Sequence, residues 1–255
     1  MNKNITHIID HFSPISLNDV DTKILLPNRI DTKFIFSSHI LNHILAQLAD
    51  EYQILEINNE KWQTYSTFYY DTPEKKFYFH HHQGKANRYK IRIRHYHTTK
   101  DVFFELKSKS NLSITRKKRI RLSENINYDA ELPQLLKKVG IHDDLNLELS
   151  LANKFTRITL ANVEKNERAT IDFDLSFTKN GEEIGLPYLV ICEVKTNKKF
   201  SNSTLYKVLK TQRIYPTRIS KYVVGNILFD QKLKKNRFKE KMILLKKIEN
   251  EYYTS

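Results

Sequence analysis

Polar and apolar residues alternate along many short segments of the chain, and this period-two pattern predicts β-strands. In one such segment, Lys90, Arg92 and Arg94 alternate with Ile91 and Ile93. The same pattern recurs along most of the sequence. It predicts strands at residues 31–36, 64–70, 89–95, 102–107, 115–122, 169–177 and 189–195.

Other segments space their apolar residues by three and four, which is typical of helices with one buried face. Ser38 is expected to cap a helix in which Leu41, Ile44, Leu45 and Leu48 share a face. Further helices are predicted at residues 130–139, 145–155 and 204–212. Strands and helices together predict an α+β fold with a large antiparallel sheet.

The polar faces of the predicted strands carry charge. Residues two apart on a strand share a face, so Lys90, Arg92 and Arg94 lie together. A polar face turned to water is ordinary for a half-buried sheet, but neighbouring cations repel one another. If the sheet curls with this face inward, the cations line a channel and require an anion. The other charged sets are Glu105 with Lys107, Lys117 with Arg119 and Arg121, Arg168 with Asp172 and Asp174, and Glu193 with Lys195.

A Glu-X-Lys pair occurs on two of these strands, as Glu105 with Lys107 and as Glu193 with Lys195. A carboxylate does not attract phosphate by itself. Mg²⁺ or Mn²⁺ binds carboxylate oxygens and bridges them to phosphate oxygens, so each pair could supply one metal ligand and one phosphate contact. The repetition suggests two related halves.

Composition agrees with an anionic partner. The 43 basic and 29 acidic residues give a net charge of +14, which suits nucleic acid, an anionic membrane or a phosphate compound. No P-loop, helix-turn-helix or RNP-like signature occurs, so specific nucleic-acid binding is not expected. The single cysteine, Cys192, is expected to be a buried core thiol, and consecutive histidines at 80–82 an exposed turn. Neither a signal peptide nor a long apolar stretch is evident, so a cytoplasmic location is expected.

Short motifs in a fixed order resemble the VTC domain, the catalytic module of vacuolar transporter chaperone polyphosphate polymerases. The resemblance covers about residues 29 to 228. The motifs are RIDTKF at 29–34, FYYDT at 68–72, IRIR at 91–94, FELK at 104–107, KKRI at 117–120, Arg168 with Ile171 and Asp172, CEVK at 192–195 and RISKY at 218–222.

This resemblance implies a triphosphate tunnel metalloenzyme: a closed antiparallel β-barrel with peripheral helices, which uses ATP to extend polyphosphate with Mn²⁺ or Mg²⁺. Glu193 would bind the metal. Glu105 and Asp31 are further candidate ligands, although relatives often carry Glu at the position of Asp31. The implied catalytic contacts are Lys33, Arg92, Arg94, Lys107 and Lys221. The phosphate-binding set is Arg29, Lys90, Lys117, Arg119, Arg157, Arg168, Lys195, Arg218 and Ser220.

Two other functions remain open at this stage. The same tunnel would be a triphosphatase if Glu105, Asp172 or Asp174 oriented a water molecule, and a module without activity would only bind polyanions. The expected organisation is a helical lead-in at residues 1–28, the tunnel domain at 29–229 and a basic helix at 230–255. That last helix would either pack on the barrel or lie on an anionic membrane, near a membrane-protein partner.

Overall fold

The computed structural model describes residues 3–27, 29–111, 115–123, 127–142, 145–197 and 202–254. The strands are β1 (Pro14–Ile15), β2 (Ile30–Ser37), β3 (Gln53–Leu55), β4 (Gln63–Asp71), β5 (Arg88–Tyr96), β6 (Asp101–Lys109), β7 (Thr115–Leu122), β8 (Glu148–Asn162), β9 (Glu167–Lys179), β10 (Glu182–Leu186) and β11 (Leu189–Thr196). The helices are α1 (Lys3–Asp10), α2 (Leu17–Lys23), η1 (Ser38–Ile40), α3 (Leu41–Ala46), α4 (Lys76–Gln83), α5 (Tyr128–Lys138), α6 (Thr204–Thr211), α7 (Lys221–Phe229), η3 (Asn236–Phe238) and α8 (Lys239–Thr254).

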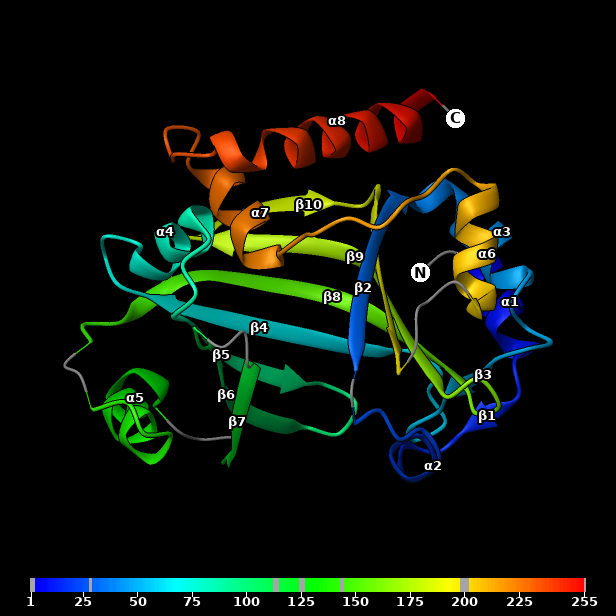
Figure 1. Cartoon of the computed structure of the whole chain (residues 1–255), viewed down its shortest axis with the longest axis horizontal. Helices are drawn as coiled ribbons and strands as arrows, with labels where there is room; N and C mark the ends of the chain where they lie inside the picture. Colours follow the sequence, from blue (N-terminus) through cyan, green and yellow to red (C-terminus); the bar gives the residue numbers. More distant parts are fainter. Residues whose placement is uncertain are drawn as a thin grey trace.

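One sheet runs through the molecule in the order β2-β11-β9-β8-β4-β5-β6-β7, with antiparallel pairing along this path. Within the described residues β2 and β7 do not pair, so the predicted closed barrel is corrected to an open sheet (Figure 1). Charge gives a physical reason. Lys33 of β2 and Lys117 and Arg119 of β7 face the same interior, and direct pairing of these edges would bring like charges together.

The open sheet is nevertheless strongly curved. Lys107 of β6 feels the charges of Asp31 and Lys33 on β2 and of Glu193 on β11, although several strands separate β6 from these two in the sheet. This proximity requires the two ends of the sheet to bend toward each other. The concave face therefore gathers polar side chains from strands that are distant in sequence.

In the segment predicted as a helix at residues 145–155, residues 145–147 are irregular and residues 148–155 are the start of β8, the strand of 15 residues between β4 and β9. Thr156, Ile158 and Thr159 continue the strand past the predicted boundary, and β-branched residues favour extended backbone. Hydrogen bonding to β4 on one edge and to β9 on the other then holds the whole segment as a strand.

An irregular pairing changes which side chains of β9 face inward. Asp174 has a positive φ of 50°, beside a register shift between Lys154 and Thr156 of β8. Such a bulge resets the alternation. Asp172 is buried in the concave face, whereas Asp174 is exposed. The prediction that both aspartates share one face is therefore wrong.

The convex face of the sheet is covered by helices on two sides (Figure 1). Helices α1, α3 and α6 enclose one apolar cluster, in which Leu41, Ile44, Leu45 and Cys192 are buried, as predicted. Helix α5 packs its Leu132, Leu135 and Leu136 on the other part, behind β5 and β6. The apolar alternation of the strands thus supplies the core.

Helices α7 and α8 lie on the other side and fill one end of the concave face. Gly225 allows α7 to approach β8 closely, since a Cβ there would collide with the side chain of Leu151. Leu245 and Ile248 of α8 are buried in the same cluster. The side of the C-terminal helix that carries Leu245 and Ile248 thus packs on the sheet, whereas its Ile243 is exposed. In the described part of the chain, no helix is long and apolar enough to cross a membrane.

Two local predictions are wrong. Residues 80–82 belong to α4 rather than to an exposed turn, and His82 is buried with its Nε2 2.7 Å from Asn236 Oδ1. Ser38 does not cap α3, because its hydroxyl donates to the Pro187 carbonyl at 2.8 Å while η1 leads into the helix. In both cases a contact distant in sequence determines the local conformation.

Candidate functional site

The polar part of the concave face holds three carboxylates, each surrounded by cations. Glu105 lies on β6, Asp172 on β9 and Glu193 on β11. The predicted charged faces thus come together on one surface. The cations around them are Lys33, Lys90, Arg92, Arg94, Lys107, Lys117, Arg119, Arg157, Lys195 and Lys221.

Glu105 is the most enclosed of the three carboxylates, with 2% of its side chain exposed. Arg92 donates from Nε to Oε2 at 2.6 Å, Lys117 Nζ lies 2.5 Å from Oε1, and Arg119 Nε lies at 3.8 Å. Burial raises the pKa of Glu105, but the charges of Arg92 and Arg94 outweigh burial and hold it well below its usual range. Glu105 is therefore an ionised counter-charge that joins β5, β6 and β7.

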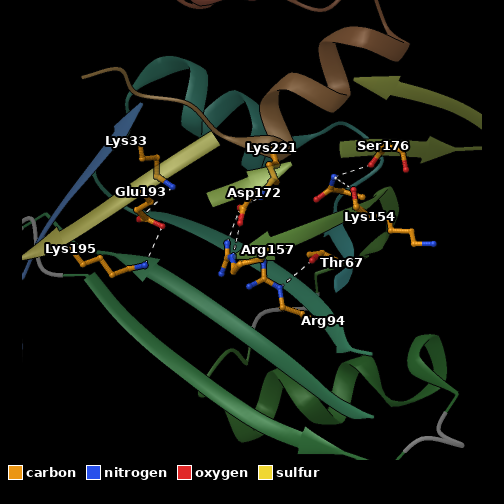
Figure 2. A network of polar contacts seen from close by, with 11 residues as sticks. Lys33, Thr67, Arg94, Lys154, Arg157, Asp172, Ser176, Glu193, Lys195 and Lys221 are labelled. Atoms are coloured by element: carbon orange, nitrogen blue, oxygen red, sulfur yellow. Dashed lines mark hydrogen bonds and ion pairs between the residues drawn. The ribbon is translucent and has the colours of Figure 1, made fainter. Parts of the chain in front are cut away.

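Asp172 forms a second centre under α7 (Figure 2). Arg157 of β8 donates to both of its oxygens, from Nε at 2.5 Å and from Nη2 at 2.8 Å, and Lys221 at the start of α7 donates from the opposite side. Burial lowers the pKa of Lys221 to about 7, although Asp172 acts in the other direction. Lys221 therefore changes its charge near neutral pH.

Glu193 forms a looser third centre at the β2 side of the site. Lys33 Nζ lies 3.5 Å from its Oε1, and Lys195 donates to Oε2 at 3.4 Å (Figure 2). Burial raises the pKa of Glu193, but the charges of Lys195 and Lys33 bring it down to about 2. With 17% of its side chain exposed, Glu193 keeps oxygen surface that another ligand can reach.

Several cations of this surface have no carboxylate partner in the described residues. Arg94 donates only to the Thr67 hydroxyl, at 3.1 Å, and lies over the rings of Tyr65 and Phe155. Lys90 lies over the Tyr69 ring, and burial followed by the charge of Arg92 lowers its pKa well below the usual range. Positive charge thus exceeds negative charge, and a buried excess of this kind is stabilised by an anion.

Other predicted residues lie at the margin. Arg29 pairs with Asp31 at 2.6 Å, and Arg168 pairs with Asp21 of α2 at 3.2 Å. Arg218 and Ser220 line a cavity beside the site rather than the carboxylate clusters. The predicted set therefore divides into a central group and a rim.

Sequence reasoning missed the residues that support the site from beneath. Asp71 is fully buried and accepts hydrogen bonds from the backbone N–H groups of Thr72, Phe77 and Tyr78 and from the Tyr222 hydroxyl. Because Tyr222 follows Lys221, this network fixes the start of α7 over Asp172. The only sequence signal was the FYYDT motif, which does not indicate a contact with residue 222.

The carboxylates of the site could supply only part of the coordination of a divalent metal. In the described residues no group of three His, Cys, Asp or Glu side chains could hold a metal. Mg²⁺ and Mn²⁺ sites commonly use one or two carboxylates and complete their coordination with substrate phosphates. Glu193 fits this arrangement, and Asp31 lies on the adjacent strand, where it pairs in register with Lys195. Glu105 fits it less well, because cations already occupy its oxygens.

A curved antiparallel sheet with a basic concave face and buried acidic counter-charges defines a protein that handles phosphate-rich anions. The sequence model of the VTC domain matches residues 28–230, so the chain belongs to the VTC domain family. The resemblance inferred from the sequence is confirmed. No curated protein sequence matches the chain.

Solved structures show a similar fold at low sequence identity. HpAC1 from Hippeastrum, described as a proposed adenylyl cyclase with dominant triphosphatase activity, is 16% identical with a TM-score of 0.54, covering 77% of this chain and 94% of HpAC1. The PH1819 protein of Pyrococcus horikoshii OT3 is 14% identical with a TM-score of 0.43, covering 78% and 99% of the two chains. At 16% identity the likeness to HpAC1 concerns the fold alone.

Proposed function

We propose that this protein is a polyphosphate polymerase, which transfers the γ-phosphoryl group of ATP to the end of a linear polyphosphate chain. The observation that carries the proposal is the excess of buried cations around Glu105, Asp172 and Glu193. A linear chain of phosphates carries charge at regular intervals, and it can contact cations from β2, β5, β6, β8 and α7 at once. Membership of the VTC domain family supports the same substrate class.

Transfer requires alignment and charge stabilisation rather than covalent participation by the protein. An oxygen of the terminal chain phosphate forms a bond to the γ-phosphorus, and the bond between the γ-phosphorus and the β-bridging oxygen breaks. ADP leaves with that oxygen. Arg92, Arg94 and Lys221 would bind the phosphoryl oxygens, whose charge spreads in the transition state. A divalent metal, Mn²⁺ or Mg²⁺, would be held by Glu193, with Asp31 as a second candidate, and would neutralise phosphate charge when bound.

The state of the carboxylates favours transfer to phosphate over transfer to water. A chain-end phosphate is already ionised and needs no base, whereas hydrolysis benefits from a carboxylate that orients and deprotonates water. Asp172 is bound by Arg157 and Lys221, and Glu105 is bound by Arg92 and Lys117. Since cations hold both pKa values far below neutrality, both groups are weak bases. The similarity in fold to HpAC1 keeps a triphosphatase as the second candidate.

The experiment separates the candidate functions by their products. The protein is incubated with Mn²⁺ and either ATP or tripolyphosphate. Long phosphate chains are then resolved on a gel, and free phosphate is measured. Chains with little free phosphate support the polymerase, and free phosphate without chains identifies the triphosphatase. Unchanged ATP and tripolyphosphate would contradict both activities and leave a polyanion-binding module.

A matched pair of variants connects any activity to the site. Lys221→Met removes one of the two cations at Asp172 and leaves Arg157 in place. Lys210→Met removes an exposed lysine of α6 that has no ion pair in the described residues. Only the first substitution should abolish turnover. Equal activity of the two variants would contradict the role of Lys221.

A further inference from the structure

A cavity of about 610 Å³ adjoins the phosphate site, between β2, α4, α7, η3 and α8. Its wall includes Lys33 of β2 and Ser220, which precedes Lys221. Arg88, also in the wall, stands two residues before Lys90 on β5 and so shares its face. The cavity therefore opens beside the cations that would hold the phosphates, and its size is ordinary for a small-molecule site.

One part of the cavity wall is strongly basic. Arg88, Arg218, Arg237 and Lys241 line it, and in the described residues none of them has a carboxylate within ion-pair distance. Arg237 instead donates to the backbone carbonyls of Gln83 and His82, at 2.6 and 3.4 Å. This wall attracts an anion.

Another part of the same wall is apolar and aromatic. Val223 and Ile227 of α7, Phe238 of η3 and Met242 of α8 form this part and pack in one apolar cluster. Phe238 also contacts His82, with ring centroids 5.4 Å apart. A bare phosphate chain gains nothing from these side chains, whereas an aromatic base would bury its faces against them.

His82 adds an unused hydrogen-bonding group. Its Nε2 donates to Asn236 Oδ1, which leaves Nδ1 as an acceptor. In the described residues this buried Nδ1 has no partner. His82 lies in the cavity wall, but its Nδ1 is enclosed, so the apolar wall rather than this nitrogen would hold a base.

We infer that this cavity holds the nucleoside part of a nucleoside triphosphate, with its phosphates extending past Lys33 into the site. This inference rests on the proposed function, in which ATP donates the phosphoryl group. Phe238, Lys241 and Met242 lie beyond residue 230, where the match to the family ends. The C-terminal helix thus adds a specificity wall to the phosphate site.

The test compares ATP with inorganic tripolyphosphate, which has the phosphates but no nucleoside, by titration calorimetry. Met242→Trp fills the cavity, and Ile243→Trp adds the same side chain on the exposed side of the same helix. We expect Met242→Trp to weaken ATP binding by about tenfold and to change tripolyphosphate binding by less than about twofold. Ile243→Trp should change neither affinity.

Three results would overturn the inference: unchanged ATP binding by Met242→Trp, equal weakening of both ligands, or an equal effect of Ile243→Trp. Equal weakening would assign the cavity to the phosphate chain. Thermal melting checks folding, and Met242→Phe, which adds less volume, replaces Met242→Trp if the latter does not fold. Because binding is measured directly, the test does not depend on polymerase activity. A Met242→Trp variant that loses affinity for ATP but not for tripolyphosphate supports the nucleoside site even if the wild-type protein makes no polyphosphate. If the wild-type protein makes polyphosphate but Met242→Trp does not change the affinity for ATP, the assignment of the cavity is wrong and the proposed function stands.

Discussion

The two Glu-X-Lys strands share a sequence pattern but place their glutamates in different surroundings. Glu105 on β6 lies between β5 and β7, both of which present cations to it at hydrogen-bonding distance. Glu193 on β11 lies between β2 and β9, and its nearest cations, Lys33 and Lys195, stand 3.5 and 3.4 Å away. The neighbouring strands therefore add to each motif the contacts that distinguish the two carboxylates.

This difference separates a structural role from a ligand role. A carboxylate enclosed by several cations is a counter-charge, and its removal leaves buried positive charge. A carboxylate with longer contacts and exposed oxygens can exchange its lysine partners for a metal ion. Of the two motif glutamates, Glu193 is therefore the one that we propose as a metal ligand, and Glu105 is the counter-charge.

The largest effect is expected from Glu105→Gln. Since Lys117 and Arg119 are partly exposed, solvent moderates the loss, and we expect the free energy of unfolding to fall by about 3 kcal/mol. Urea denaturation measures this change. Added tripolyphosphate should restore much of the stability, because it replaces the missing negative charge. Glu193→Gln is the matched control, and equal destabilisation of the two variants would remove the distinction between the two centres.

The next effect concerns turnover. Glu193→Gln should lower metal-dependent turnover of ATP by about 100-fold, because the amide replaces a charged ligand oxygen. Binding of tripolyphosphate without metal should persist. Steady-state assays over a range of Mn²⁺ concentrations measure the loss, and full activity in this variant would refute the assignment of Glu193 as metal ligand.

The Asp172 centre predicts a pH dependence that neither glutamate shares. Lys221 has a pKa of about 7, so it is charged below that pH and neutral above it. We expect kcat/KM, which reports the free enzyme, to fall by about tenfold per pH unit as the pH rises above 7. Lys221→Arg keeps its charge and should flatten the profile between pH 6 and 9. An identical decline in that variant would assign the pH dependence to another group.

The sequence predicted the strands and their charged faces well, because alternation is a local property that burial of one face imposes. It failed where pairing distant in sequence overrides the local pattern. β8 is a strand because β4 and β9 bind both of its edges, and Asp174 leaves the site because of a bulge.

The candidate site shows the same division. Arg92, Lys107 and Glu193 could be selected because each shares a face with other charged residues of its own strand. The ion pair of Lys221 with Asp172 and the support of Tyr222 by Asp71 depend on where α7 packs, which no periodicity in the sequence reveals. The wall formed by Phe238 and Met242 was unpredictable for the same reason.

The smallest effect concerns the lysines of the two motifs. Lys195 and Lys33 contact the Glu193 oxygens and would compete there with a metal ion, so we expect Lys195→Met to tighten Mn²⁺ binding by about threefold. Lys107→Met is the matched change on β6. Lys107 feels the charge of Glu193 but makes no ion pair with it, so this variant should tighten Mn²⁺ binding by less than Lys195→Met does. Manganese titration followed by electron paramagnetic resonance measures both. Weaker Mn²⁺ binding in Lys195→Met would mean that this lysine orients Glu193 for the metal instead of competing with it.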